Sequence, residues 1–125
     1  MLIPDHLVYA ETHEWVRVED DGTLAIGITD FGQDQLGPLV YVDMPAVGKQ
    51  LKRGGEAGIV ESNKTASDLH APVEGEVVAV NEALVQTPEA VNEAPYEQWI
   101  FKLKPAAPFS KDGFLDAAGY LKLIS

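Results

Sequence analysis

Short runs of alternating apolar and polar residues, separated by glycines and prolines, most limit how this chain can fold. Four such runs stand out: TLAIGIT at 23–29, LVYVDM at 39–44, EVVAV at 76–80 and WIFKLK at 99–104. Alternation with a period of two is typical of strands that bury one face. Short strands punctuated by Gly and Pro favour a mainly β sandwich or barrel.

The alternation also predicts which side chains face the core. In the first run it places Leu24, Ile26 and Ile28 on one face. In the second it places Val40, Val42 and Met44 on one face, with Leu39 and Tyr41 on the other. In the last it turns Trp99, Phe101 and Leu103 inward, and Lys102 and Lys104 outward.

Helix signals are few. In TDFGQDQLG, Thr29 or Asp30 can cap a helix that Gly37 ends. In TPEAVNEAP, Thr87 is the expected cap, with Pro88 in the first turn and Pro95 as terminator. A short C-terminal helix is expected to start at Asp116. We therefore expect a single domain over 1–125, with a core at about 8–105 and a helical segment at about 110–125.

Composition excludes several classes of function. The chain has 125 residues and a net charge of -11, from 20 acidic and 9 basic side chains, so it would repel nucleic-acid phosphates. It has no cysteine, which excludes a disulfide framework, a cysteine–metal site and a thiol nucleophile. It shows neither an apolar run long enough to span a membrane nor a signal peptide at its start, and we expect a cytoplasmic location.

The stretch GIVESNKTASDLHAPVEGEV, residues 58–77, predicts two strands joined by a tight turn at Asn63-Lys64. A two-residue hairpin loop favours positive φ, which suits Asn63 better than Lys64, so a type I turn in a longer loop is equally compatible. In either turn the Lys64 amine projects from the sheet. Lys64 is then a solvated turn lysine or a modification site, and the residues alone do not decide between the two.

A resemblance to a known family bears on that choice. The motifs that carry it are, in chain order, YAETHEWVRVE, AIGITDFGQDQLG, VYVDMPAVG, VESNKTASD, APVEGEVVAVNEAL, NEAPY, WIFKLKP and FLDAAGY. In this order they resemble the H protein of the glycine cleavage system. The resemblance implies a flattened barrel or sandwich of two antiparallel sheets, of the lipoyl and biotinyl carrier type. It also implies lipoic acid in amide linkage on Lys64.

The same resemblance implies roles for other residues. Glu61 and Gly75 match the acid and the glycine that lipoate-attaching enzymes read, three residues before and eleven after the lysine. Thr12, Glu14 and Asp68 match positions of a cleft that shelters the loaded arm, where a carboxylate can hold a protonated amine. On this reading, Glu14→Ala makes the loaded arm easier to release or hydrolyse.

The implied function is that of a carrier without catalytic residues of its own. Its lipoyl arm carries an aminomethyl group and reducing equivalents between glycine decarboxylase, aminomethyltransferase and dihydrolipoamide dehydrogenase. A separate lipoate-attaching enzyme loads the cofactor, and a monomer suits visits to several clefts. No metal site is expected, because His6 and His70 are isolated. His13 is not expected to act with Glu14, because neighbouring strand residues point to opposite faces.

The chain also departs from the family pattern. Asn63 stands where Val is usual, Pro38 stands where an acid is usual, and PYEQW lacks the usual glycines before Trp99. These changes leave a second carrier function open: an H-like lipoate-binding protein serving another oxidative pathway, such as bacterial sulfur oxidation. An unmodified binding domain is a further alternative. A biotin carrier is disfavoured, because methionines do not flank Lys64.

Overall fold

The computed structural model describes all residues, 1–125, as two antiparallel sheets with four short helices. The larger sheet has six strands, in the order β1 (Val8–Tyr9), β2 (Glu14–Val18), β3 (Leu24–Ile28), β9 (Phe101–Pro105), β8 (Gly75–Val80) and β5 (Gln50–Leu51). The smaller sheet has three, in the order β4 (Leu39–Asp43), β6 (Glu56–Ser62) and β7 (Ala66–His70). The predicted mainly β fold of two antiparallel sheets is confirmed.

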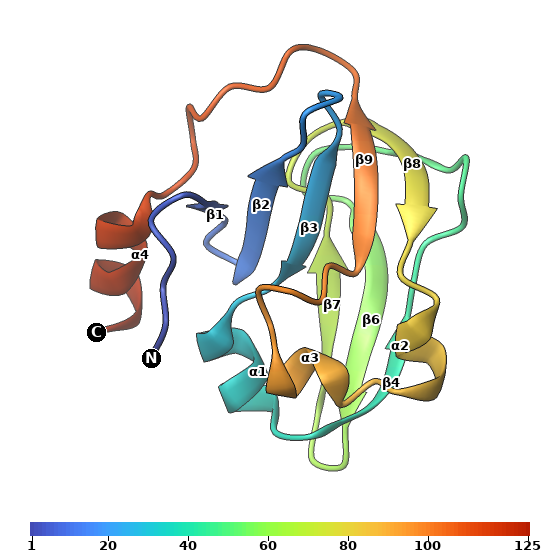
Figure 1. Ribbon diagram of the computed structural model, residues 1–125, viewed down its shortest axis with the longest axis vertical. Coiled ribbons are helices and arrows are strands. Elements are labelled where there is room, and N and C mark those ends of the chain that lie inside the picture. Colours follow the sequence, from blue (N-terminus) through green and yellow to red (C-terminus); the bar gives the residue numbers. More distant parts are fainter.

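Figure 1 shows β6 and β7 running side by side to a hairpin tip at the lower end of the molecule, beyond the other loops. The two termini lie close together on one side of the larger sheet, beside β1. The hairpin is therefore free of the chain ends and extends into open space.

The apolar core has two parts, on opposite faces of β3. Leu24, Ile26 and Ile28 belong to the main cluster, which side chains from both sheets fill, as the alternation predicts. Ala25 points the other way, into a smaller cluster with Trp15 and residues of the C-terminal segment. Because both faces of β3 are covered, all five of its residues are buried.

The alternation in β4 is wrong in part. Leu39 and Val42 are buried, whereas Val40 and Tyr41 are about half exposed. The pairing of β4 with β6 is irregular between Leu39 and Tyr41, where a β-bulge shifts the register. A bulge adds one residue to one strand, so the side chains after it change faces relative to those before it.

The prediction that Trp99 faces the main core together with Phe101 and Leu103 is also wrong. Strand β9 begins only at Phe101, and Phe101 and Leu103 are fully buried in the main core as expected. Trp99 instead packs, partly buried, against the smaller cluster. The amine of Lys102 lies 4.8 Å from the centre of the Trp99 ring, a cation–π contact.

Two helices begin where the sequence predicts, and α1 also ends there; of the helical segment expected at about 110–125, only the part from Ala117 is helical. Helix α1 (Asp30–Leu36) is capped by Thr29, whose hydroxyl accepts from the N–H of Gly32, and it ends at Gly37 with φ at 82°. Helix α4 (Ala117–Ile124) is capped by Asp116. The caps satisfy backbone N–H groups that a helix start leaves unpaired.

The predicted helix at residues 87–95 is wrong in its start. Helix α2 (Ala83–Gln86), which the sequence did not predict, comes first, and α3 (Ala90–Glu93) follows it. The Thr87 hydroxyl does not cap α3. It donates instead to the carbonyl of Ala83, the first residue of α2. Among all four helices, none has the length and apolar character needed to cross a membrane.

Candidate functional site

The Lys64 hairpin closes tightly without left-handed residues at its tip. The N–H of Ser62 donates to the carbonyl of Thr65 at 2.8 Å, and the hydroxyl of Ser62 accepts from the N–H groups of Lys64 and Thr65. The one non-glycine residue with positive φ is His13, so neither Asn63 nor Lys64 adopts a left-handed backbone. This excludes the primed turns and explains why lysine is tolerated at the tip.

The Lys64 side chain is exposed and has no salt-bridge partner. It lies beside the end of α1, since a Cβ atom placed on Gly37 would be 3.5 Å from the Lys64 Cε. This is an ordinary contact distance, so the lysine side chain runs alongside the end of the helix. The amine is therefore accessible to a modifying enzyme, without an ion pair to break.

A cleft of about 410 Å³ opens next to the hairpin tip. Its walls come mainly from three segments: the chain before and at the start of β2, helix α1, and strand β7 with the residue before it. Ile28 of β3 and Val60 of β6 also line it. Thr12, Glu14 and Asp68 all line it, although 56 residues separate the first and last of them. The structure thus brings the three predicted cleft residues together in one cavity that begins beside Lys64.

Glu14 is the most unusual residue of this cleft, because its side chain is only 2% exposed. Its carboxylate accepts from the Thr12 hydroxyl and from the backbone N–H of His70, the latter at 3.0 Å. Burial raises the pKa of Glu14 above its ordinary value, and the hydrogen bonds from Thr12 and His70 oppose that rise. Glu14 is therefore not an ordinary surface acid.

His70 was expected to be isolated, and that prediction is wrong. Its Nδ1 atom lies 3.3 Å from the Glu14 carboxylate, in addition to the backbone contact. The two residues are far apart in sequence and meet because the end of β7 lies beside the start of β2. No spacing rule links them, so sequence reasoning had no signal for this pair.

His13 does not hydrogen-bond to Glu14, but the strand alternation invoked to separate them is not the reason. His13 precedes β2 and has φ at 72°, a left-handed backbone. Its Nδ1 atom lies 2.7 Å from the hydroxyl of Tyr120 in α4. Burial lowers the pKa of His13, which favours the neutral imidazole.

Glu61 and Gly75 lie outside the cleft. Glu61 is half-buried in β6, one residue from the end of that strand. Gly75 starts β8 opposite Pro105, and a Cβ atom there would collide with the carbonyl oxygen of Lys104. Gly75 therefore has a structural reason to be glycine, because β8 and β9 approach closely at this point.

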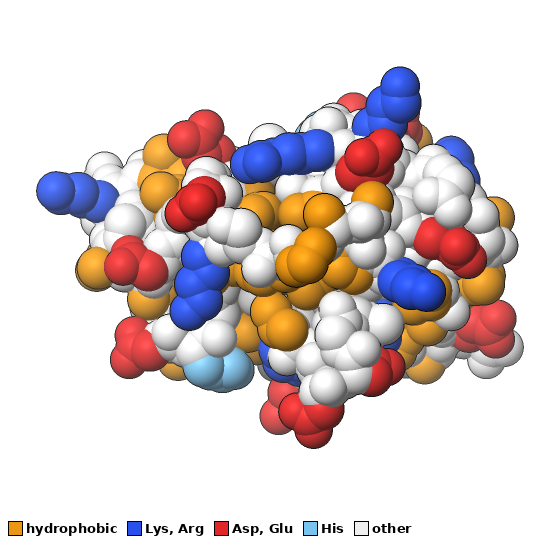
Figure 2. Space-filling model, turned by 90° about the horizontal axis from the view of Figure 1, so that it is seen from above, with side chains coloured by type: hydrophobic (Ala, Val, Ile, Leu, Met, Phe, Trp, Pro, Cys, Tyr) orange, Lys and Arg blue, Asp and Glu red, His pale blue; other side chains and the backbone are white.

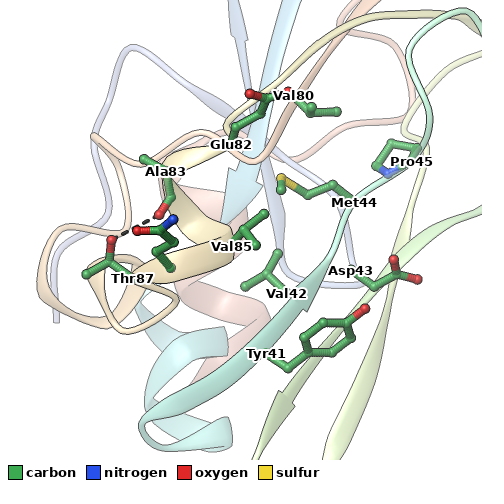
Figure 3. Close-up of a pocket in the computed structure, with 11 residues that line it drawn as sticks. Tyr41, Val42, Asp43, Met44, Pro45, Val80, Glu82, Ala83, Val85 and Thr87 are labelled. Carbon is green, nitrogen blue, oxygen red and sulfur yellow. Dashed lines mark hydrogen bonds between the residues drawn. The ribbon is translucent and has the colours of Figure 1, made fainter.

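A larger depression of about 810 Å³ lies elsewhere, between β4 and α2, where Val42, Met44 and Val85 face each other (Figure 3). Its two acids, Asp43 and Glu82, are exposed at the surface. It contains none of the predicted site residues and no buried ionisable group. A buried carboxylate in a cleft that opens near an accessible lysine is the stronger sign of a functional site, so the smaller cleft is the candidate.

The end of the molecule opposite the hairpin has a different character. Figure 2 shows apolar side chains gathered in its middle, with acidic and basic side chains mixed around them. This surface therefore does not present a patch of charge of a single sign. The features that distinguish this chain chemically are at the hairpin end.

An exposed lysine on a hairpin of a two-sheet β fold, beside a cleft, is the arrangement expected of a carrier protein with a covalently attached arm. Comparison with known proteins gives the family. The glycine cleavage H-protein model matches residues 7–125, and the chain belongs to that family.

Individual relatives agree with this assignment. The chain is 54% identical over 118 residues to glycine cleavage system H protein 2 of Pseudomonas aeruginosa, covering 94% of this chain and 92% of the relative. It is 52% identical over 124 residues to the H protein of Nitrosospira multiformis, covering 99% and 96%. The crystal structure of a Mycobacterium marinum H protein matches with a TM-score of 0.87 at 36% identity, covering 96% and 97%.

As a member of this family the chain is a lipoyl carrier and not an enzyme, and its lipoic acid is bound covalently to a lysine. It carries an aminomethyl group and reducing equivalents between glycine decarboxylase, aminomethyltransferase and dihydrolipoamide dehydrogenase. A lipoate-attaching enzyme is its further partner. The relatives are named for glycine cleavage, which supports this function over the sulfur-oxidation alternative.

Proposed function

We propose that Lys64 is the lysine that carries the lipoyl group, and that the cleft lined by Thr12, Glu14 and Asp68 holds the loaded arm. The observation that carries this proposal is the position of an exposed, unpaired lysine at the mouth of a cleft with a buried carboxylate inside it. The residues present thus fit a lipoyl group.

The reach of the hairpin agrees with this assignment. Strand β7 rises by about 3.3 Å per residue, so Asp68 lies roughly 13 Å along the chain from Lys64. A lysine side chain alone is too short for that span, whereas a lysine extended by an amide-linked arm can follow the strand. The dithiolane of a bound lipoyl group supplies the thiol–disulfide chemistry that a chain without cysteine lacks.

The two carboxylates in the cleft differ in their surroundings. Asp68 is exposed and lies on the hairpin strand, whereas Glu14 is almost fully buried. A protonated amine in the cleft can donate to either, and a charge-assisted hydrogen bond is stronger where water is excluded. Glu14 then binds the amine inside the cleft, and Asp68 can accept a hydrogen bond from it nearer to solvent. Thr12 orients the Glu14 carboxylate through its hydroxyl.

Glu61 and Gly75 complete the proposal as residues that the lipoate-attaching enzyme reads. Glu61 lies close enough to the tip to contact an enzyme that holds Lys64. Gly75 would act through the shape of the returning strand, in addition to its structural need for glycine. We place the protein in the cytoplasm. We also treat residues 1–125 as one carrier domain, because a single main cluster of apolar residues joins both sheets.

The test is the mass of the protein isolated from its own host, measured intact and on peptides. We expect one lipoyl-sized increment, on the peptide that contains Lys64. Lys64→Arg should abolish the increment, and Lys49→Arg, which changes another exposed lysine, should keep it. Unmodified Lys64 in a host that lipoylates its other carriers would refute the assignment.

A further inference from the structure

We propose that Tyr120, in the C-terminal helix, is a positioning residue that holds two walls of the cleft together through its hydroxyl group. This inference rests on the proposed function of the cleft. The Tyr120 side chain is fully buried. Its hydroxyl lies 2.7 Å from His13 Nδ1 and 2.7 Å from Thr29 Oγ1, and these partners are 107 and 91 residues away in sequence.

The two partners belong to opposite walls. His13 lies between Thr12 and Glu14, and all three line the cleft. Thr29 caps α1, which supplies the facing wall, and its hydroxyl accepts from the N–H of Gly32 at 3.1 Å. The Tyr120 hydroxyl therefore adds a side-chain tie to the backbone hydrogen bond that already joins these two segments, in which the N–H of Thr29 donates to the carbonyl of His13 at 3.0 Å.

One direction of these hydrogen bonds gives both hydroxyl protons an acceptor within the chain. Because the Gly32 N–H already donates to Thr29, the Thr29 hydroxyl is free to donate to the Tyr120 oxygen. The Tyr120 hydroxyl then donates to Nδ1 of a neutral His13 with its proton on Nε2. In the reverse direction the Thr29 proton has no acceptor among these groups. Bonds aligned in this way strengthen one another.

His13 needs such support because of its backbone. It is the one non-glycine residue in the left-handed region, with φ at 72°. A strained backbone of this kind persists only where its surroundings fix it. Four contacts do so: its N–H donates to the carbonyl of Ala10, its carbonyl accepts from the N–H of Thr29, its ring packs 5.0 Å from that of Phe31, and its Nδ1 meets Tyr120.

A neighbouring tyrosine offers a matched control. The Tyr9 ring stacks on the Tyr120 ring, with centroids 4.8 Å apart and planes 15° from parallel. The Tyr9 hydroxyl, however, donates to the carbonyl of Pro4, away from the cleft. Tyr9→Phe and Tyr120→Phe thus remove the same group from the same buried cluster, and only the second loses contact with the cleft walls.

The experiment compares lipoylated wild-type protein, Tyr120→Phe, Tyr9→Phe and Glu14→Gln after loading by the glycine decarboxylase. The readout is the lifetime of the loaded arm against hydrolysis. Tyr120→Phe should shorten it roughly three- to tenfold, the value of one hydrogen bond, and Tyr9→Phe should leave it within about twofold of wild type. A second readout, on protein without lipoate, is the ¹⁵N NMR signal of His13. It should report a single neutral tautomer in wild type and a mixture in Tyr120→Phe.

The outcomes separate the two proposals. The positioning role of Tyr120 is overturned if the loaded arm has the same lifetime in Tyr120→Phe and Tyr9→Phe. This holds whether that shared lifetime is shorter than in wild type or unchanged. If the loaded arm hydrolyses as fast in wild type as in Glu14→Gln, the cleft does not protect the arm, and the proposed function of the cleft is refuted. Should Tyr120→Phe not fold, His13→Asn takes its place, because Asn tolerates the left-handed backbone, and the same shortening is expected.

Discussion

Glu14→Gln tests both the stability and the function of the cleft. The substitution keeps the volume of the side chain and removes its charge. In the fold, glutamine can accept from the N–H of His70 and donate to the hydroxyl of Thr12, which turns to become an acceptor. Because both neighbours remain satisfied, we expect the variant to fold normally.

The effect on stability follows from the raised pKa of Glu14. A carboxyl group whose pKa is higher in the fold than in the unfolded chain contributes stability that is present in full below its ordinary pKa, near 4.5. That contribution is lost as the pH rises through the folded pKa. Glutamine does not ionise, so Glu14→Gln should gain stability relative to wild type between pH 4 and pH 7.5. Urea unfolding at these two pH values measures the difference.

The effect on function has the opposite sign. A hydrogen bond from an ammonium group to a carboxylate contributes about 1.5–3 kcal/mol, and one to a neutral amide about 0.5–1.5 kcal/mol. The difference of about 1–1.5 kcal/mol corresponds to a lifetime of the loaded arm about fivefold to tenfold shorter. An unchanged lifetime would refute the role of Glu14 in holding the amine. A wild type that gains stability over Glu14→Gln as the pH rises would refute the reasoning from burial.

Two further predictions concern the fold around the site. Gly75→Ala forces a methyl group against the Lys104 carbonyl and should lower the free energy of unfolding by about 1–3 kcal/mol in urea. If the folded variant is lipoylated at the wild-type rate, Gly75 is needed for the fold and not for recognition by the attaching enzyme. Burial raises the pKa of Tyr120 from 10 to about 12, so the stability it contributes is full below about pH 10 and is lost as the pH rises through 12. The free energy of unfolding, measured in urea between pH 9 and pH 12, should fall with pH for this reason. In Tyr120→Phe that fall with pH should be smaller than in wild type.

Local patterns in the sequence were sufficient for much of the fold. The alternation in residues 24–28 identified β3 and its inward side chains, and Thr29 and Gly37 marked the ends of α1. These elements are set by contacts between residues close in sequence. The same reasoning failed at Leu39 and Val40, because a bulge depends on how β4 pairs with β6. It also failed at Thr87, whose hydroxyl finds a partner in the preceding turn.

For the site, the sequence by itself determined the chemical inventory and the hairpin. The absence of cysteine and the residues around Asn63 and Lys64 come directly from the chain. Only the tertiary structure decided that Glu14 is buried, that His70 contacts it, and that Tyr120 reaches His13. The physical reason is that burial and hydrogen bonding between distant segments depend on which sheets and helices pack together. No local pattern records that the end of β7 lies beside the start of β2, or that Tyr120 of α4 reaches both His13 and Thr29.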